Sequence, residues 1–264
     1  MTRRLDTAGM RHARSLPAIL ALALAAYAAP AHADFQVRSP IVEYGEWELE
    51  HNGAITFDKS KSGRNNDQSY TFSLGYAPFE WWRIELEGET EAPPGGNLQY
   101  TATTMENMFE LAPQGKYWLD PGFFVEYSLA GQHHSPNEIT FGPVLQKEAP
   151  GFGGAGTLHT LNLFFSKELG PNRGDETGLS FAWQSRLLLN PYFEPGIEYY
   201  ADISDIGAFG KPADQGHRVG PMFAGAWNLA PYGTVKYELG YLFGITRATE
   251  SGAVRWKVEY EMHF

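Results

Sequence analysis

Glutamates stand at matching places in four segments that each begin with proline. The segments are Pro78-Phe-Glu-Trp-Trp-Arg-Ile-Glu85, Pro121-Gly-Phe-Phe-Val-Glu126, Pro195-Gly-Ile-Glu198 and Pro231-Tyr-Gly-Thr-Val-Lys-Tyr-Glu238. A ring of carboxylates attracts cations and repels anions. If the four segments lie side by side in register, their glutamates form part of such a ring, and we expect a site that favours cations.

The other chemically reactive candidates are a histidine and a serine. Residues 133–137 read His-His-Ser-Pro-Asn. This order is similar to the His-x-Ser-Asn pattern of two outer-membrane enzymes, phospholipase A and the lipid A deacylase, which implies His133 as base and Ser135 as nucleophile. Pro136 interrupts the pattern, and no residue in reach of the base is placed to orient it. The sequence therefore predicts no enzyme and no catalytic residue, with an outer-leaflet lipid hydrolase as the second alternative.

Metal, thiol and nucleic-acid chemistry are disfavoured by composition and spacing. The chain has no cysteine, which removes disulfides, thiolate zinc sites and cysteine nucleophiles. The histidines after residue 33 have no ligand spacing: His51, His133, His134, His159, His217 and His263. Lys and Arg total 20 against 31 Asp and Glu, a net charge of −11, so the basic face that nucleic acid requires is missing. We predict no metal site, no cofactor and no nucleic-acid partner, with an unspecific divalent cation among the lumen glutamates as the alternative.

The elements that must position these residues are β-strands. Residues 254–264 alternate without an error between apolar or aromatic and charged side chains. The apolar set is Val254, Trp256, Val258, Tyr260, Met262 and Phe264. Such a strand has one face for an apolar medium and one for water.

A chain that ends on this kind of strand resembles the bacterial outer-membrane β-barrels. In that family the terminal aromatic strand is read by the barrel-assembly machinery. The resemblance implies an assembly signal made of Trp256, Tyr260 and Phe264. It also implies outer-membrane lipid, lipopolysaccharide and the assembly machinery as partners. The alternative to a membrane barrel is a secreted, soluble β-protein.

The same alternation predicts twelve strands, with ten or fourteen as the alternatives. Their lengths suit a tilted crossing of the hydrocarbon layer. The predicted strands are 43–57, 68–77, 80–92, 99–111, 120–133, 138–148, 157–168, 177–189, 193–204, 217–228, 234–248 and 253–264. We therefore predict an all-β fold, a single antiparallel transmembrane β-barrel over residues 34–264.

The connections between these strands predict two different ends of the barrel. Tight turns at 77–79, 190–192 and 229–233 alternate with longer polar connections such as 58–67 and 205–216. Aromatic residues cluster beside the tight turns: Phe79, Trp81, Trp82, Tyr117, Trp118, Tyr192, Phe193 and Tyr232. Barrels of this kind have both termini and their short turns in the periplasm, so we expect the tight turns on the periplasmic side, with the aromatic residues as a girdle at that interface.

The two faces of the strands are predicted to meet lipid and water respectively. A basic side chain on the lipid face at the bilayer midplane costs about 2–4 kcal/mol, so the charged face must line the lumen. The predicted lumen residues are Arg83, Glu85, Glu87, Glu126, Glu198, Lys236, Glu238 and Glu259. Acids outnumber bases there, which favours cationic or neutral solutes. The same residues could instead form an ion-pair network that braces the barrel.

The first 33 residues are typical of a targeting segment. Arg3, Arg4, Arg11 and Arg14 precede a short apolar run that ends at Ala31-His32-Ala33. This arrangement predicts a secretory signal peptide over residues 1–33, cleaved after Ala33. We expect export and a final location in the outer membrane.

A further resemblance concerns the last hairpin. Residues 238–246 read Glu-Leu-Gly-Tyr-Leu-Phe-Gly-Ile-Thr, and the hairpin that they open is similar to that of poorly characterised proteobacterial barrels. Those barrels are described as transporter-like or linked to a meta-pathway of phenol degradation. Their usual Asp or Pro in the last turn is replaced here by Thr249-Glu250-Ser251-Gly252. The resemblance implies fold and location, and it carries over no catalytic residue.

These observations predict passage of a small solute. We expect passive or facilitated movement of a neutral or cationic molecule across the outer membrane. The first alternative is a non-conducting barrel whose lumen is filled by its own side chains and which serves structure or an interaction.

Overall fold

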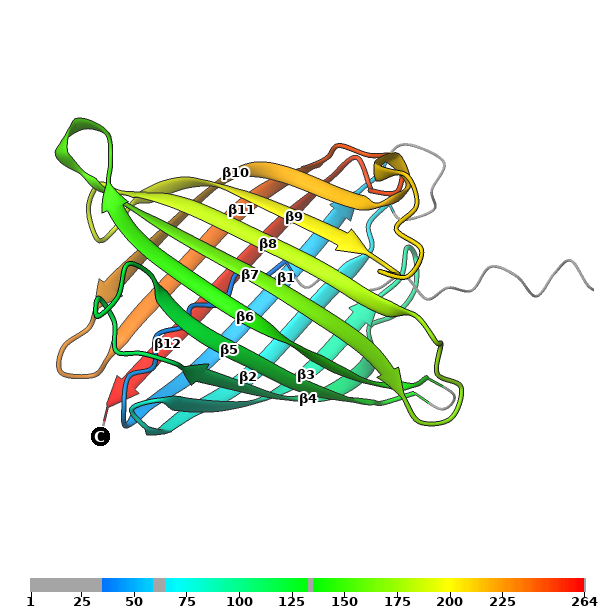
Figure 1. The fold of residues 1–264 in the computed structure, drawn as a ribbon, viewed down its shortest axis with the longest axis horizontal. Helices are drawn as coiled ribbons and strands as arrows, with labels where there is room; N and C mark the ends of the chain where they lie inside the picture. Colours follow the sequence, from blue (N-terminus) through cyan, green and yellow to red (C-terminus); the bar gives the residue numbers. More distant parts are fainter. Residues whose placement is uncertain (1–34, 59–64, 133–134, 264) are drawn as a thin grey trace, which may run out of the picture. The chain divides into compact units, whose positions relative to one another are not determined.

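The computed structural model describes residues 35–58, 65–132 and 135–263, which contain twelve β-strands (Figure 1). The predicted signal peptide lies outside the described residues, as do His133, His134 and Phe264. The strands are β1 (Glu46–Phe57), β2 (Gln68–Phe79), β3 (Trp82–Ala92), β4 (Gln99–Glu110), β5 (Asp120–Ala130), β6 (Asn137–Pro150), β7 (Gly156–Leu169), β8 (Thr177–Leu188), β9 (Glu194–Ile203), β10 (Gly216–Asn228), β11 (Thr234–Gly244) and β12 (Gly252–His263). No helix among the described residues is long and apolar enough to cross a membrane.

Each strand pairs antiparallel with its neighbour in the chain, and β12 pairs back onto β1 to close a barrel. Glu46 faces His263 at this seam, and Glu50 faces Glu259. Closure leaves no unpaired sheet edge, which an open twelve-strand sheet would expose. The predicted all-β antiparallel barrel of twelve strands is confirmed, and the alternatives of ten and fourteen strands are wrong.

Side chains divide between the two faces of the wall as the alternation predicts. Leu49, Phe72 and Leu86 are exposed on the outside, with 47%, 63% and 57% of their surface accessible. Their chain neighbours Glu48 and Glu85 are buried inside. Successive side chains of a strand point to opposite faces, so one apolar and one charged set per strand gives an apolar exterior and a polar interior.

The two ends of the barrel differ in their connections. We call the end that carries residues 80–81, 111–119, 151–155, 189–193 and 229–233 the turn end, and the opposite end the loop end. Six aromatic residues beside these turns are at least 50% exposed: Phe79, Trp81, Tyr117, Trp118, Tyr192 and Tyr232. The last described residue of β12, His263, lies at the turn end (Figure 1).

Residues 35–43, which we call the lumen segment, form no strand and lie inside the barrel. Phe35, Gln36, Arg38 and Val42 are each 8% exposed, although they belong to no sheet. A turn at Tyr44 and Gly45 joins the segment to β1 at the turn end. The predicted first strand, 43–57, therefore begins three residues too early, because Glu43 belongs to this inner segment.

Candidate functional site

Hydrogen bonds to its backbone fix the lumen segment to the inner wall. Asn162 of β7, which is fully buried, accepts from the Arg38 N–H over 2.7 Å and donates to the Arg38 carbonyl over 2.9 Å. Nearer the loop end, the Tyr200 hydroxyl donates to the Phe35 carbonyl over 3.1 Å. A non-strand backbone inside a barrel needs such partners, because buried unpaired N–H and C=O groups are costly.

The Arg38 side chain adds an ion pair to this attachment. Its Nε donates to Glu106 Oε2 over 3.0 Å, and a second guanidinium nitrogen contacts the other Glu106 oxygen. Glu126 lies 3.7 Å from the same guanidinium, which also sits 4.6 Å from the centre of the Phe124 ring. The sequence analysis missed Arg38, because nothing in a single arginine outside the predicted strands indicates that it enters the lumen.

Two apolar clusters hold the segment near its ends. The cluster nearer the turn end consists of Val42, Ala77, Met108, Phe124, Val144 and Phe164. The cluster nearer the loop end consists of Phe35, Ala54, Tyr200, Leu242 and Ala253. The Phe124 and Phe164 rings stack at 4.8 Å between centres. The interior therefore has a hydrophobic core of its own, to which the lumen segment contributes Val42 and Phe35.

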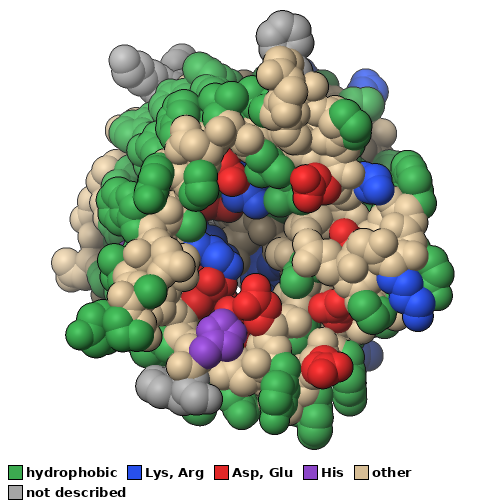
Figure 2. Space-filling view, turned by 90° about the vertical axis from the view of Figure 1, so that its left-hand side faces the viewer, with side chains coloured by type: hydrophobic (Ala, Val, Ile, Leu, Met, Phe, Trp, Pro, Cys, Tyr) green, Lys and Arg blue, Asp and Glu red, His purple; other side chains and the backbone are tan. Residues whose placement is uncertain are grey.

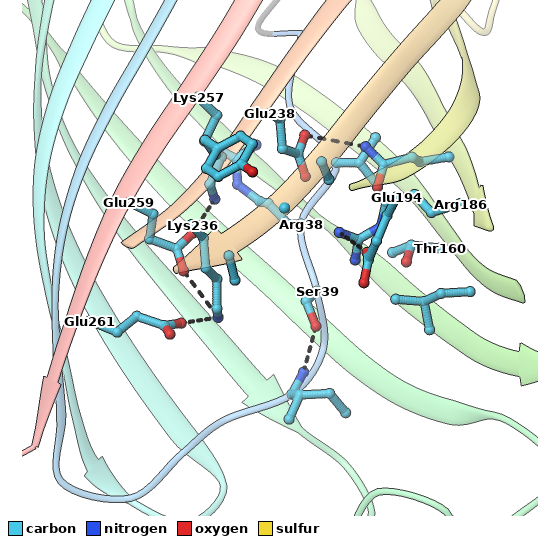
Figure 3. A pocket seen from close by; sticks show the side chains of 18 of the residues that line it. Arg38, Ser39, Thr160, Arg186, Glu194, Lys236, Glu238, Lys257, Glu259 and Glu261 are labelled. Carbon is cyan, nitrogen blue, oxygen red and sulfur yellow. Dashed lines mark hydrogen bonds and ion pairs between the residues drawn. The ribbon is translucent and has the colours of Figure 1, made fainter. Parts of the chain in front are cut away.

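A cavity of about 650 Å³ occupies the part of the lumen that the segment leaves free. Figure 2 views the molecule from the turn end and shows a hollow there with acidic and basic side chains inside. In Figure 3, Arg38 and Ser39 lie between the charged side chains of β11 and β12 and those of β8 and β9. The cavity thus opens toward the turn end and has the lumen segment as part of its wall.

The predicted lumen residues fall into two groups in the structure. Those that line the cavity are Arg83, Glu85, Lys236, Glu238 and Glu259. Glu87 and Glu198 are buried in the inner wall, and Glu126 lies beside Arg38. The alternation along the strands also places Glu50, Glu106, Arg186 and Lys257 on the lumen face, and these residues line the cavity too.

The four glutamates expected to form a ring form two separate clusters instead. Glu85 and Glu126 lie on either side of Glu106, each paired with it across the sheet. Glu198 and Glu238 share one guanidinium, that of Arg255. Arginines on other strands and on the lumen segment divide the acids, so matching positions along the strands do not produce a continuous ring.

Ion pairs neutralise much of the cavity wall. Lys257 lies 2.8 Å from Glu259 and also contacts Glu50, whereas Lys236 lies 3.3 Å from Glu259 and also contacts Glu261. The lining carboxylates still exceed the lining cations. The carboxylates are Glu43, Glu46, Glu50, Glu85, Glu106, Glu194, Glu238, Glu259 and Glu261, and the cations are Arg38, Arg83, Arg186, Lys236 and Lys257.

An arginine-centred cluster lies beside Phe35 of the lumen segment, toward the loop end. Arg218 donates to the two oxygens of Glu250 over 2.5 and 2.8 Å and to Asp202 over 2.9 Å. Its guanidinium lies 5.1 Å from the centre of the Phe35 ring. Glu250 belongs to the turn that connects β11 to β12. Here that turn sends a carboxylate into the lumen, where it is 2% exposed.

Two residues of the predicted assembly signal, Trp256 and Tyr260, lie on the outer face of β12. The Tyr260 hydroxyl donates to the Tyr232 carbonyl over 2.6 Å. The Trp256 ring lies over Gly53 of β1, where any side chain would overlap it. Trp256 and Tyr260 thus pack across the neighbouring strands; Phe264 lies outside the described residues.

Catalytic and metal-ligating arrangements are few among the described residues. Ser135 is exposed, and its proposed base, His133, lies outside the described residues. Three groups have ligand atoms within 4.8 Å of one another: Glu48, Glu50 and Glu85; Glu85, Glu87 and Glu106; and Glu43, Glu46 and His263. The third group combines residues that are more than 200 positions apart in the sequence, so spacing in the sequence could not have indicated it.

Comparison with known proteins finds structural similarities at low sequence identity. No protein-family model matches the chain, and no curated protein matches its sequence. The crystal structure of the Acinetobacter baumannii outer membrane protein Omp33 aligns at 9% identity and a TM-score of 0.42, covering 84% of this chain and all of that one. A bacterial polysaccharide outer membrane secretin aligns at 9% identity and a TM-score of 0.41, with the same coverage. The twelve-strand barrel rests on the chain's own strand pairing.

Proposed function

We propose that this chain is an outer-membrane barrel that lets a small neutral or cationic solute pass, and that its lumen segment closes the passage. Export after cleavage of residues 1–33 would deliver it there. The support for a membrane location is the apolar exterior around a charged interior, with exposed aromatic residues gathered at the turn end. In water, an exterior of this kind would be an aggregation hazard, whereas in a bilayer it is the required surface.

The outward face would then contact lipid, with lipopolysaccharide in the outer leaflet. Trp256, Tyr260 and Phe264 remain the residues that we propose the barrel-assembly machinery reads. The resemblance of residues 238–246 to transporter-like barrels linked to phenol degradation favours a transport role and does not identify the solute.

The single observation that carries the proposed passage is the cavity of about 650 Å³, which ends on a segment of chain. If side chains filled the whole lumen, the charged side chains on opposite sides of it would touch one another. Here the walls stand apart around a space that is open at the turn end. The surplus of carboxylates on these walls favours cations or neutral molecules over anions.

One feature favours the alternative of a barrel that never conducts. The lumen segment has apolar contacts near both ends and a buried ion pair between them. A segment fixed in this way is a permanent filling if the energy needed to displace it exceeds what any solute or membrane potential supplies.

Conductance measurements decide between the two. The barrel would be refolded, inserted into planar bilayers, and compared with a variant that lacks residues 35–42. We expect small, intermittent conductance from the intact chain and a larger, steady, cation-preferring conductance from the variant. Reversal potentials in a salt gradient report the preference.

Either of two outcomes would refute the proposal. Absence of current from both proteins, when both show the heat-dependent gel shift of a folded barrel, would establish the non-conducting alternative. A preference for anions in the variant would reject the solute class.

A further inference from the structure

We propose that Glu43, Glu46 and His263 form a binding site for a divalent transition-metal ion such as Zn²⁺ at the turn end of the barrel. The set combines one imidazole with two carboxylates, which are common ligands of zinc. The proposal stands on the local geometry of the rim and does not depend on whether the barrel conducts.

A turn and a strand pair bring the three side chains together. The Glu46 N–H donates to the Glu43 carbonyl over 3.1 Å, which closes a turn over residues 43–46. Gly45 has a φ of +81° in this turn, a conformation that glycine adopts readily. Glu46 then faces His263 directly across the β1–β12 seam. Directly opposed residues of an antiparallel pair have Cβ atoms about 5 Å apart, so their side chains meet.

The distances suit an ion lying between the side chains better than direct hydrogen bonds. His263 Nε2 lies 3.6 Å from a Glu43 oxygen and 3.8 Å from Glu46 Oε2. Hydrogen bonds of this type measure about 2.7–3.2 Å. A tetrahedral ion with ligands at about 2.1 Å holds neighbouring ligand atoms about 3.4 Å apart. Small side-chain rotations would bring all three groups to that spacing.

An independent observation is a buried oxygen that has no other use. Glu46 Oε2 is inaccessible and accepts no hydrogen bond from the described residues, and the Glu46 side chain is only 6% exposed. It is this oxygen that faces His263. Leaving a buried carboxylate oxygen without a partner is costly, and a metal ion would remove that cost. The His263 and Glu43 side chains are 52% and 62% exposed, so an ion can enter from solution.

The other two carboxylate groups have arginines in direct contact, whereas Lys236, the cation that acts most strongly on Glu46, forms no ion pair with it among the described residues. Arg83 lies 2.9 Å from Glu48 in the first group, and Arg38 forms a double contact with Glu106 in the second. A guanidinium at such a distance repels a metal ion and satisfies the carboxylate. Among the described residues, these groups therefore serve as ion-pair networks.

Bound metal would join three parts of the chain at one point. Glu43 is the last residue of the lumen segment, Glu46 begins β1, and His263 ends the described part of β12. The ion would thus fasten the foot of the lumen segment to both strands of the closing seam.

Zinc titration of the folded barrel tests the site. The protein would carry no histidine tag, and Zn²⁺ alone would be titrated by calorimetry and followed by thermal unfolding. We expect one ion per chain and a raised unfolding temperature. Glu43→Gln and His263→Ala should each weaken binding by at least about tenfold, since even outer-shell partners of metal sites have effects of that size. His159→Ala, on β7 and outside the cluster, should bind as the unaltered protein does.

Several results would overturn the proposal. The site is refuted if Zn²⁺ fails to bind the folded, unaltered barrel, or if His263→Ala binds as tightly. Equal competition by Ca²⁺, which prefers oxygen ligands, would show that the carboxylates act without the imidazole. Glu43→Gln changes an exposed side chain ahead of β1, so it tests the site even if His263→Ala disturbs barrel closure.

Discussion

Arg255 is 2% exposed and lies between two carboxylates of the inner wall. Its Nε donates to Glu198 over 3.0 Å, and another guanidinium nitrogen donates to Glu238 over 2.6 Å. Removing one partner of a buried ion pair leaves an uncompensated charge and costs about 3–5 kcal/mol. We expect Arg255→Ala to lower the free energy of unfolding by that amount in urea titrations of the lipid-inserted barrel.

The matched control for Arg255 is an exposed arginine in an ion pair. Arg247 lies 3.0 Å from Asp214, with side chains 76% and 58% exposed. Exposed pairs contribute about 0–1 kcal/mol, so Arg247→Ala should leave the unfolding midpoint nearly unchanged. Equal effects of the two substitutions would mean that Arg255 is solvated in the lumen and that the wall is looser than described.

At the scale of the element, the lumen segment depends on one amide side chain. Leucine and asparagine side chains have similar volumes, and the substitution Asn162→Leu removes both hydrogen bonds to the Arg38 backbone. Each buried group left unpaired costs about 1–3 kcal/mol in the closed state, so the open fraction should rise by at least about fivefold. Single-channel recording gives this fraction directly.

Gln184→Leu is the control at this scale. Gln184 is another buried lumen amide, but its hydrogen bond goes to Glu238 of the wall, over 3.2 Å. We expect the Gln184→Leu variant to have the same open fraction as the unaltered protein. If Asn162→Leu also left the open fraction unchanged, the lumen segment would not be the gate.

For the whole molecule, the apolar exterior and closed sheet predict how the protein fractionates. We expect the barrel in the outer-membrane fraction, running at a different position on gels before and after boiling, because closed barrels resist detergent until heated. Recovery of a soluble periplasmic protein without a heat-dependent shift would contradict the membrane location. A strand-breaking substitution such as Leu74→Pro serves as an unfolded reference, since proline removes a ladder hydrogen bond.

The strands and their two faces could be predicted from sequence because both depend on neighbours in the chain. Period-two alternation is a local property, and the turns beside Pro78 and Pro191 are local too. Most observed strand ends therefore fall within a few residues of the predicted ones. Twelve strands followed from dividing the chain into such repeats.

The hydrogen-bond and ion-pair partners of the lumen side chains could not be predicted, because they depend on how the barrel closes. Arg38 and Asn162 are 124 residues apart, and Arg255 and Glu198 are 57 apart. Alternation indicates that a charged side chain faces the lumen, but the partner depends on barrel shear and on what else occupies the interior. The lumen segment itself has no repeated pattern, so its position became evident only in three dimensions.

The position of the lumen segment also constrains the order in which the molecule is built. The segment continues directly into β1, and β1 makes the seam with β12, the pair most distant in sequence. Contacts of such long separation form late, because the connecting chain must first be ordered. A ring of strands that closed before the segment was inside would have to be threaded lengthwise afterwards. Entry of the segment into the interior during biogenesis, before β1 and β12 pair, avoids that threading.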